Sequence, residues 1–211
     1  MTLRGAERKE KILQVAEEII LQKGFAATSI DDILQQAHIT KGGFFYHFKG
    51  RDELAKGLLE RYLVEDRLFF QGLIERAQQL SEDPLQQLLV FLNLLAEAMG
   101  DLPGVHPGCL IVSFTYESQQ FNEDVQALLA ESTLEWRDIF RELLKNALQA
   151  HPMKIDVPLD ELADSLSSTI EGGIILSKVL SDQQTLVQQI RQYRNYIRLL
   201  FNDVSPQISE P

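Results

Sequence analysis

Residues 28–49, with the sequence TSIDDILQQAHITKGGFFYHFK, hold the side chains of this chain that are best suited to chemistry. The segment reads as two helices joined by a tight turn, and the second helix is too short to be stable alone. It carries polar side chains beside an apolar set of Ile39, Phe44 and Phe48. A helix of this kind packs on the preceding helix and presents amides, a hydroxyl and a cation to phosphates and base edges. The pattern predicts a helix-turn-helix that enters the major groove of DNA.

Three kinds of side chain in and around this segment suit DNA. Cations neutralise phosphates, hydroxyls at helix starts cap the helix and donate to phosphates, and rings bind phosphate or read base edges. Two adjacent glycines each cost a helix about 1 kcal/mol relative to alanine, which close approach of DNA would explain. The alternative is that the rings merely cover a surface and the lysines are solvated. The predicted DNA-binding residues are Thr28, Thr40, Lys41, Gly42, Gly43, Tyr46, His47, Lys49 and Arg51.

A 3.6-residue apolar periodicity recurs along the chain and strand signals are nearly absent, which predicts an all-α fold. Three short helices, the first at about 7–23 and ended by Gly24, form an N-terminal unit. Further helices are expected at about 51–80, 84–99, 109–116, 121–149, 159–181 and 185–202. We predict a DNA-binding domain at 1–50, a helical ligand-binding and dimerisation domain at 51–204, and a disordered tail at 205–211.

Composition limits the classes of partner. Of 211 residues, 20 are Lys or Arg and 31 are Asp or Glu, and the net charge of −11 opposes indiscriminate binding to polyanions. Residues 1–50 hold seven basic and six acidic side chains, so the N-terminal quarter is the part expected to touch nucleic acid. The single cysteine excludes a disulfide framework or a cysteine-built zinc cluster. With no apolar stretch of membrane-spanning or signal length, we expect a cytoplasmic protein without membrane contact, metal or cofactor.

Residues 10–54 resemble the DNA-binding domain of the TetR family of transcriptional repressors. The similar parts are the helix ILQVAEEIILQKGF, the helix TSIDDILQQA, the recognition helix TKGGFFYHF and the start of the next helix. The resemblance implies a homodimeric repressor that binds a pseudo-palindromic operator. When an effector binds or modifies the C-terminal domain, the repressor would then dissociate from the operator. The later segment SSTIEGGIILSKVL is similar to the penultimate helix through which such proteins dimerise.

Three positions depart from the family pattern. His38 stands where the turn usually has glycine, and histidine tolerates a left-handed conformation better than most residues. Phe45 stands where tyrosine is usual, so a phenolic phosphate contact is lost and Tyr46 would carry it alone. Arg51 replaces a common lysine, which keeps the cation and adds bidentate geometry toward phosphate. None of these changes argues against DNA binding.

An apolar cavity between the C-terminal helices would suit a small apolar effector. At helical spacing, however, aromatic and aliphatic residues are more often ordinary core. The candidate lining residues are Phe91, Leu95, Phe114, Trp136 and Phe140.

Cys109 follows Pro107-Gly108 at the expected start of a helix, where partial positive charge favours the thiolate. This placement is similar to a branch of the TetR family that senses electrophiles or oxidants through a cysteine. A buried cysteine that acts as a small apolar residue is the competing interpretation.

Adjacent glycines at 172–173 lie inside a predicted helix and suggest close helix packing, as in a symmetric four-helix interface with the last helix. Packing within one chain is the alternative. The predicted interface residues are Leu166, Ile170, Gly173, Ile174, Tyr193, Ile197 and Leu200.

Two other classes of function remain open from the sequence. An enzyme would use Cys109 as nucleophile with His106 or His151 as base, but no spaced acid, phosphate-binding loop or metal-ligand pair accompanies them. A helical interaction protein that lacks DNA binding is the second alternative, and it predicts no salt-dependent DNA affinity.

Overall fold

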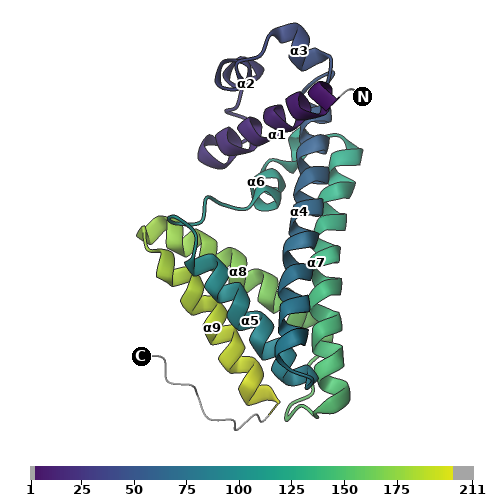
Figure 1. The fold of residues 1–211 in the computed structure, drawn as a ribbon, viewed down its shortest axis with the longest axis vertical. Helices are drawn as coiled ribbons and strands as arrows, with labels where there is room; N and C mark the ends of the chain where they lie inside the picture. Colours follow the sequence, from purple (N-terminus) through teal and green to yellow (C-terminus); the bar gives the residue numbers. More distant parts are fainter. Residues whose placement is uncertain (1–2, 202–211) are drawn as a thin grey trace. The chain divides into compact units, whose positions relative to one another are not determined.

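The structure is a computed structural model that describes residues 3–201 (Figure 1). Helices make up its regular structure and no strand occurs within the described range, so the predicted all-α fold is confirmed. The predicted tail at 205–211 lies outside the described residues. The elements are α1 (Leu3–Lys23), α2 (Ile30–Ala37), α3 (Lys41–Phe45), α4 (Arg51–Leu80), α5 (Pro84–Gly100), α6 (Leu110–Tyr116), a 3₁₀ turn (Ser118–Gln120), α7 (Glu123–Ala150), α8 (Leu159–Leu180) and α9 (Gln183–Leu200).

Contacts divide the chain into two compact units. The first comprises residues up to Leu68 together with Pro107–Leu134, and the second comprises Phe69–His106 together with the residues from Glu135 on. The long helices α4 and α7 each contribute residues to both units. The first unit therefore contains residues 28–49, here called the reading head, as well as α6.

In the first unit, α1 buries the apolar stripe expected from its periodicity, with Ile12, Ala16 and Ile20 at 1% exposure or less. Gly24 ends the helix with φ of +85°, which lets the chain turn toward the reading head. The guanidinium of Arg61 in α4 binds the carboxylates of Glu10 and Glu17 in α1. These contacts fix α1, which supports the reading head, against the first part of α4.

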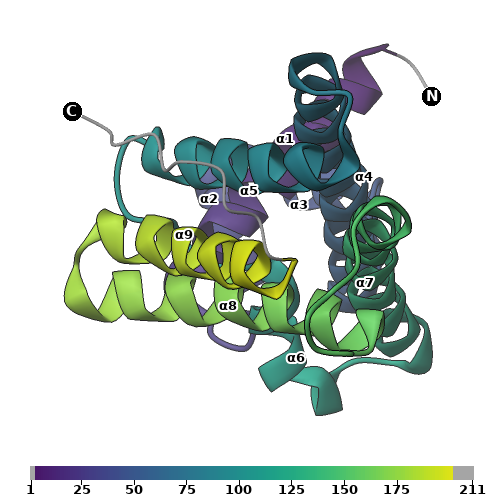
Figure 2. The ribbon, with the colours of Figure 1, turned by 90° about the horizontal axis from the view of Figure 1, so that it is seen from below.

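In the second unit, α5, α8 and α9 lie side by side, as both views of the ribbon show (Figures 1 and 2). Asp83 caps α5 by accepting from the amide of Gln86 at 2.9 Å, and Pro84 follows it at the start of the helix. The side-chain amide of Gln183 in α9 donates to the carbonyl of Gly100 at the end of α5, at 2.9 Å, and to that of Leu102 just beyond it, at 2.8 Å. Polar contacts thus stabilise both ends of α5.

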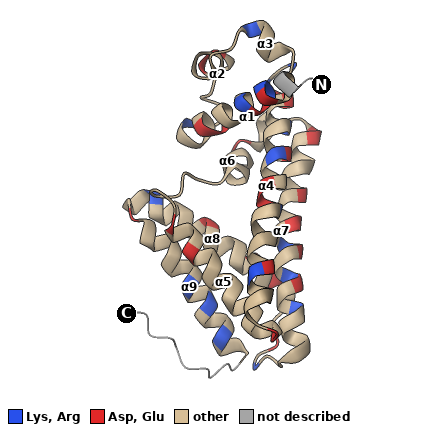
Figure 3. Cartoon of the chain, viewed as in Figure 1, with Lys and Arg blue, Asp and Glu red and all other residues tan. Residues whose placement is uncertain are grey.

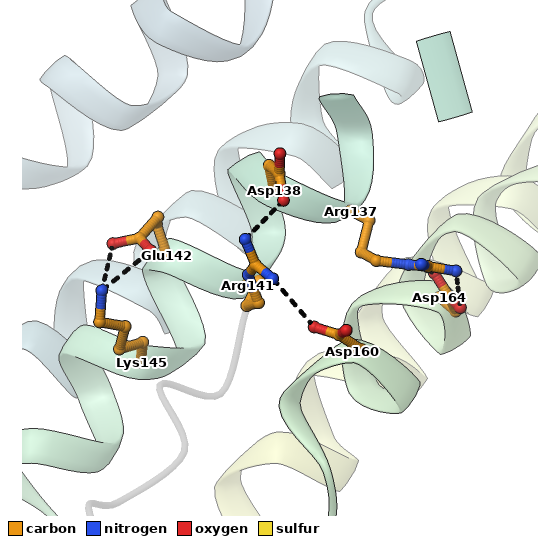
Figure 4. Close-up of polar contacts among 7 residues, drawn as sticks. All are labelled: Arg137, Asp138, Arg141, Glu142, Lys145, Asp160 and Asp164. Atoms are coloured by element: carbon orange, nitrogen blue, oxygen red, sulfur yellow. Dashed lines mark hydrogen bonds and ion pairs between the residues drawn. The ribbon is translucent and has the colours of Figure 1, made fainter. Parts of the chain in front are cut away.

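An ion-pair cluster joins α7 to α8 within the second unit (Figure 4). Arg137 donates from two nitrogens to the two carboxylate oxygens of Asp164, each at 2.7 Å. Arg141 pairs with Asp138 of its own helix at 2.6 Å and with Asp160 of α8 at 3.4 Å. The bidentate pair fixes direction as well as distance, so it sets how the two helices face each other.

Candidate nucleic-acid interface

The turn between α2 and α3 has the conformation that a helix-turn-helix requires. His38 ends α2 with φ of +56° and ψ of +46°, a left-handed conformation, and its amide bonds back to carbonyls of α2. Thr40 then caps α3, with its hydroxyl oxygen accepting from the amide of Gly43 at 3.1 Å. Both features agree with the predictions from the sequence. His38 adopts the left-handed conformation that glycine usually has at this turn, and Thr40 caps the short helix.

The start of α2 corrects one prediction. Ser29, and not Thr28, is the N-cap: its hydroxyl accepts from the amide of Asp32 at 3.1 Å, and Asp32 accepts from the amide of Ser29. Hydrogen bonds from Lys23 and Ser29 hold the pKa of Asp32 well below its usual range. The side chain of Thr28 is 4% exposed and donates to the carbonyl of Gly24 at 2.7 Å. Thr28 is therefore structural and presents no hydroxyl to a phosphate.

The short helix α3 separates buried from exposed rings. Phe44 and Phe48 are almost fully buried, whereas Tyr46 is 76% exposed, and Lys41 and Lys49 are exposed as well. Phe45, which was omitted from the predicted contacts, is also exposed, at 41%. An exposed apolar ring next to cations is suited to contact with a thymine methyl group.

Gly42 has no reason within the chain to be glycine. A Cβ built on it would meet no atom within 4 Å, and its backbone is not left-handed. Gly43 differs, because its Cβ would lie 3.3 Å from the hydroxyl oxygen of Thr40. The internal packing therefore explains Gly43 in part but not Gly42, whose contact with DNA stays a prediction.

Arg51 makes contacts within the first unit that the sequence did not predict. Its guanidinium donates to the carbonyl of Phe25 and lies over the Phe25 ring, 4.4 Å from the ring centre. These two contacts bind the start of α4 to the loop before α2. One nitrogen of the guanidinium is thus engaged inside the unit, and a phosphate contact through its other N–H groups stays a prediction.

Two cations of α1 belong to the same surface and were missed from the sequence. Burial lowers the pKa of His47. The positive charges of Arg8 and Lys9 in α1 act on the imidazole and lower its pKa further. The ammonium of Lys9 also lies 5.7 Å from the centre of the Phe48 ring. Figure 3 shows Lys and Arg on α1 as well as on α3. Helix α1 thus adds positive charge beside the reading head, and only the charge asymmetry of residues 1–50 hinted at it.

Comparisons with known proteins bear directly on this arrangement. Residues 12–58 match the family of bacterial regulatory proteins described as the tetR family, and residues 84–193 match the tetracyclin repressor-like C-terminal domain. The chain belongs to the TetR family. Both the left-handed turn and the capped recognition helix therefore belong to an established DNA-binding domain, and the chain is a helix-turn-helix transcriptional regulator and not an enzyme.

Relatives resemble the chain over most of its length. The HTH-type transcriptional repressor DhaR of Mycobacterium sp. (strain GP1) is 23% identical over 85% of this chain and 87% of its own. The HTH-type transcriptional repressor NemR of Escherichia coli (strain K12) is 22% identical over 90% of this chain and 94% of its own. A TetR transcriptional regulator from Chloroflexus aurantiacus shares the fold, with a TM-score of 0.78 and 23% identity over 93% of this chain and 96% of its own.

The predicted cavity residues do not form one group. Phe91 and Phe140 are buried in the second unit and pack with Phe70, whose ring centre lies 5.3 Å from that of Phe140. Phe114 is buried in the first unit, with its ring centre 5.0 Å from those of Phe25 and Phe121. The other two candidates also lie in the second unit, Leu95 buried and Trp136 half-buried. The sequence could not separate them because helical periodicity does not show which unit a face joins.

Cys109 is the N-cap of α6, one residue before the helix, and its side chain is 4% exposed. The hydroxyl of Tyr62 in α4 donates to the Cys109 sulfur at 3.6 Å. The burial of Cys109 agrees with its interpretation as a small core residue. Its role as a sensor stays a prediction.

The predicted interface residues lie largely in the chain's own core, which corrects their assignment. A Cβ on Gly173 would lie 2.7 Å from a methyl carbon of Leu186 in α9, so this glycine allows α8 and α9 to approach within one chain. Ile170 is half-buried. The buried members of the set are Leu166, Gly173, Ile174, Tyr193, Ile197 and Leu200.

A different face of α8 and α9 is exposed and apolar. Gly172 shares it with the exposed residues three, four and seven positions further on, and its Cβ would meet no atom within 4 Å. We call this face the α8–α9 apolar face. Its exposed large side chains are Ile175, Leu176, Val179 and Leu180 near the end of α8, and Tyr196 and Leu199 further along, toward the end of α9.

Among the residues that the structure describes, no helix combines the length and apolar character needed to cross a membrane.

Proposed function

We propose that this TetR-family regulator is a cytoplasmic homodimeric repressor whose two reading heads bind a pseudo-palindromic DNA operator. The observation that carries the proposal is the recognition helix, with its left-handed turn at His38, its cap at Thr40 and its exposed Lys41 and Tyr46. This arrangement leaves α3 amides, a phenol and cations available to phosphates and base edges. That relatives such as DhaR and NemR are called repressors supports repression over activation.

The α8–α9 apolar face is the proposed dimer interface. Six large apolar side chains are exposed along these two neighbouring helices, four of them together near the end of α8, and one chain leaves them uncovered. Two copies related by a two-fold axis bury the same patch against itself, which gives a closed dimer. A dimer is required because two-fold symmetric reading heads bind half-sites about one helical turn of DNA apart.

Release from DNA is proposed to follow when an apolar or electrophilic effector binds or modifies the region outside the reading head. Helix α4 contributes residues to both units, so a change around it reaches the reading head. The effector needs higher affinity for the conformation in which the two heads no longer match the operator. Operator affinity then falls although no DNA contact is altered.

The test of DNA binding is fluorescence anisotropy with DNA that flanks the protein's own gene, at two salt concentrations and with random duplex as competitor. We expect tight binding that resists the competitor and weakens with salt. Replacing Lys41 and Lys49 together by alanine should reduce the slope of log affinity against log salt by about 2, or one per phosphate contact. Lys145→Ala, which removes a cation paired with Glu142 in the second unit, is the matched control.

Absence of any specific site, in the flanking DNA and after selection from random duplexes, would support the helical interaction protein that lacks DNA binding. An unchanged salt slope in the double variant would instead move the DNA contact away from the reading head.

The sensor role of Cys109 has a direct test, because it is the only cysteine in the chain. Iodoacetamide forms a carbon–sulfur bond with the thiolate, iodide leaves, and the thiol proton passes to solvent. We expect this reaction to release the wild-type protein from its operator, and Cys109→Ser to bind DNA normally without being released. Anisotropy and intact mass report both steps. Release of the serine variant by the same treatment would exclude Cys109 as the sensor.

A further inference from the structure

The loop between α1 and the reading head is held by a carboxylate from a distant part of the sequence. Glu117 follows α6 directly, and its two carboxylate oxygens accept from consecutive backbone amides of this loop. The amide of Phe25 donates at 3.1 Å and the amide of Ala26 at 2.6 Å. Hydrogen bonds to an ionised acceptor are about twice as strong as neutral ones. Glu117 therefore fixes the backbone three residues before Ser29 caps α2.

The loop is shaped to receive this carboxylate. A Cβ on Gly24 would lie 3.0 Å from one oxygen of Glu117, and the φ of +85° at Gly24 also favours glycine. Close by, the ring of Phe25 packs against those of Phe114 and Phe121, with centres 5.0 Å and 4.7 Å away. These two rings lie on either side of Glu117 in the sequence. Polar and apolar contacts thus join the same two segments.

Helix α6 connects this contact to the cysteine. Cys109 is the N-cap residue of α6 and Glu117 is its C-cap residue, so the two residues lie at opposite ends of one seven-residue helix. A short helix moves as a rigid element, and carboxylate–amide hydrogen bonds weaken steeply with small changes of distance and angle. A displacement of α6 is therefore transmitted to the loop before α2.

We infer that Glu117, which lies outside the helix-turn-helix, is a positioning residue for DNA binding and couples α6 to the reading head. It acts by holding the backbone of Phe25 and Ala26 and it touches no DNA. The inference rests on the proposed operator binding. It assigns the coupling to one carboxylate and two amides within the first unit.

The central experiment compares Glu117→Gln with Glu131→Gln, which removes an equal charge from an exposed position of α7 in the same unit. Loss of a negative charge alone strengthens DNA binding slightly, so we expect Glu131→Gln to bind the operator as well as or better than wild type. In glutamine one of the two acceptor oxygens is replaced by an NH₂ donor, which would face an amide N–H, so both hydrogen bonds cannot persist in this geometry. We therefore expect Glu117→Gln to bind about tenfold more weakly, a factor within the range of coupled sites.

Hydrogen exchange gives a readout that does not depend on DNA. The amides of Phe25 and Ala26 should exchange faster in Glu117→Gln than in wild type, while amides in the middle of α1 stay equally protected. Glu117→Asp keeps the charge but is one methylene shorter, so it should also speed exchange and weaken operator binding. This second variant separates the geometry of the carboxylate from its charge.

Equal operator affinities and equal loop exchange in Glu117→Gln and Glu131→Gln would overturn the inference. So would faster exchange without weaker operator binding, because the loop would then not position the reading head. Failure of the wild-type protein to bind any operator would contradict the proposed function instead, and the exchange data would still show whether Glu117 holds the loop.

Discussion

Gly42→Ala is expected to weaken operator binding by about 10- to 100-fold while leaving the protein as stable as wild type or more stable. A Cβ at this position meets no atom within 4 Å, so the substitution introduces no clash in the protein alone. Alanine favours the helix over glycine by up to about 1 kcal/mol. The added methyl group would lie where the backbone of α3 approaches DNA. Thermal unfolding and anisotropy measure the two effects separately.

Gly72→Ala provides the matched control. Gly72 is also a helical glycine whose Cβ would meet nothing within 4 Å, but it lies in α4 in the second unit. We expect a similar gain in stability and no change in operator affinity. If Gly42→Ala binds the operator as tightly as Gly72→Ala does, DNA does not approach α3 at this residue.

Val179→Asp is expected to convert the protein to monomers and to reduce operator affinity by about 100-fold or more, because linked half-site binding is lost. Val179 is 76% exposed on the α8–α9 apolar face, so aspartate is well solvated in the single chain. In the proposed dimer the same carboxylate would be buried opposite its symmetry-related copy, which is strongly unfavourable. Analytical ultracentrifugation gives the mass, and anisotropy gives the affinity.

Val64→Asp is the control for this substitution, since Val64 is the same residue type, 51% exposed on α4 in the first unit, and belongs to neither α8 nor α9. It should remain dimeric and bind DNA normally. A dimeric Val179→Asp would show that the copies associate through another surface. A monomeric protein with full operator affinity would remove the need for a dimer altogether.

Several features of α1 and of the reading head could be predicted because they depend on residues close in sequence. The apolar stripe of α1, the glycine that ends it and the Thr40 cap each involve positions within one or two helical turns. The left-handed His38 followed from the usual glycine at that place in the family pattern. Even here the local signal had limits: the hydroxyls of Thr28 and Ser29 are both able to cap α2, and burial of Thr28 decided between them.

The contacts of residues with several chemically reasonable partners could not be predicted from the sequence. Arg51 was assigned to phosphate, but it binds the carbonyl and ring of Phe25, 26 residues earlier. Arg8 and Lys9 joined the candidate site because α1 folds back beside His47. Glu117 showed no signal at all, since its two amide partners lie more than 90 residues away in the sequence.

The sequence by itself determined the all-α fold, the order of the helices and the position of the reading head. These follow from 3.6-residue periodicity, from caps and turn residues, and from the resemblance of residues 10–54 to the TetR family. The tertiary structure decided which apolar residues of α8 and α9 pack inside the chain and which stay exposed. Periodicity shows that a helix has an apolar face, but the neighbouring helix that covers that face is chosen by long-range packing.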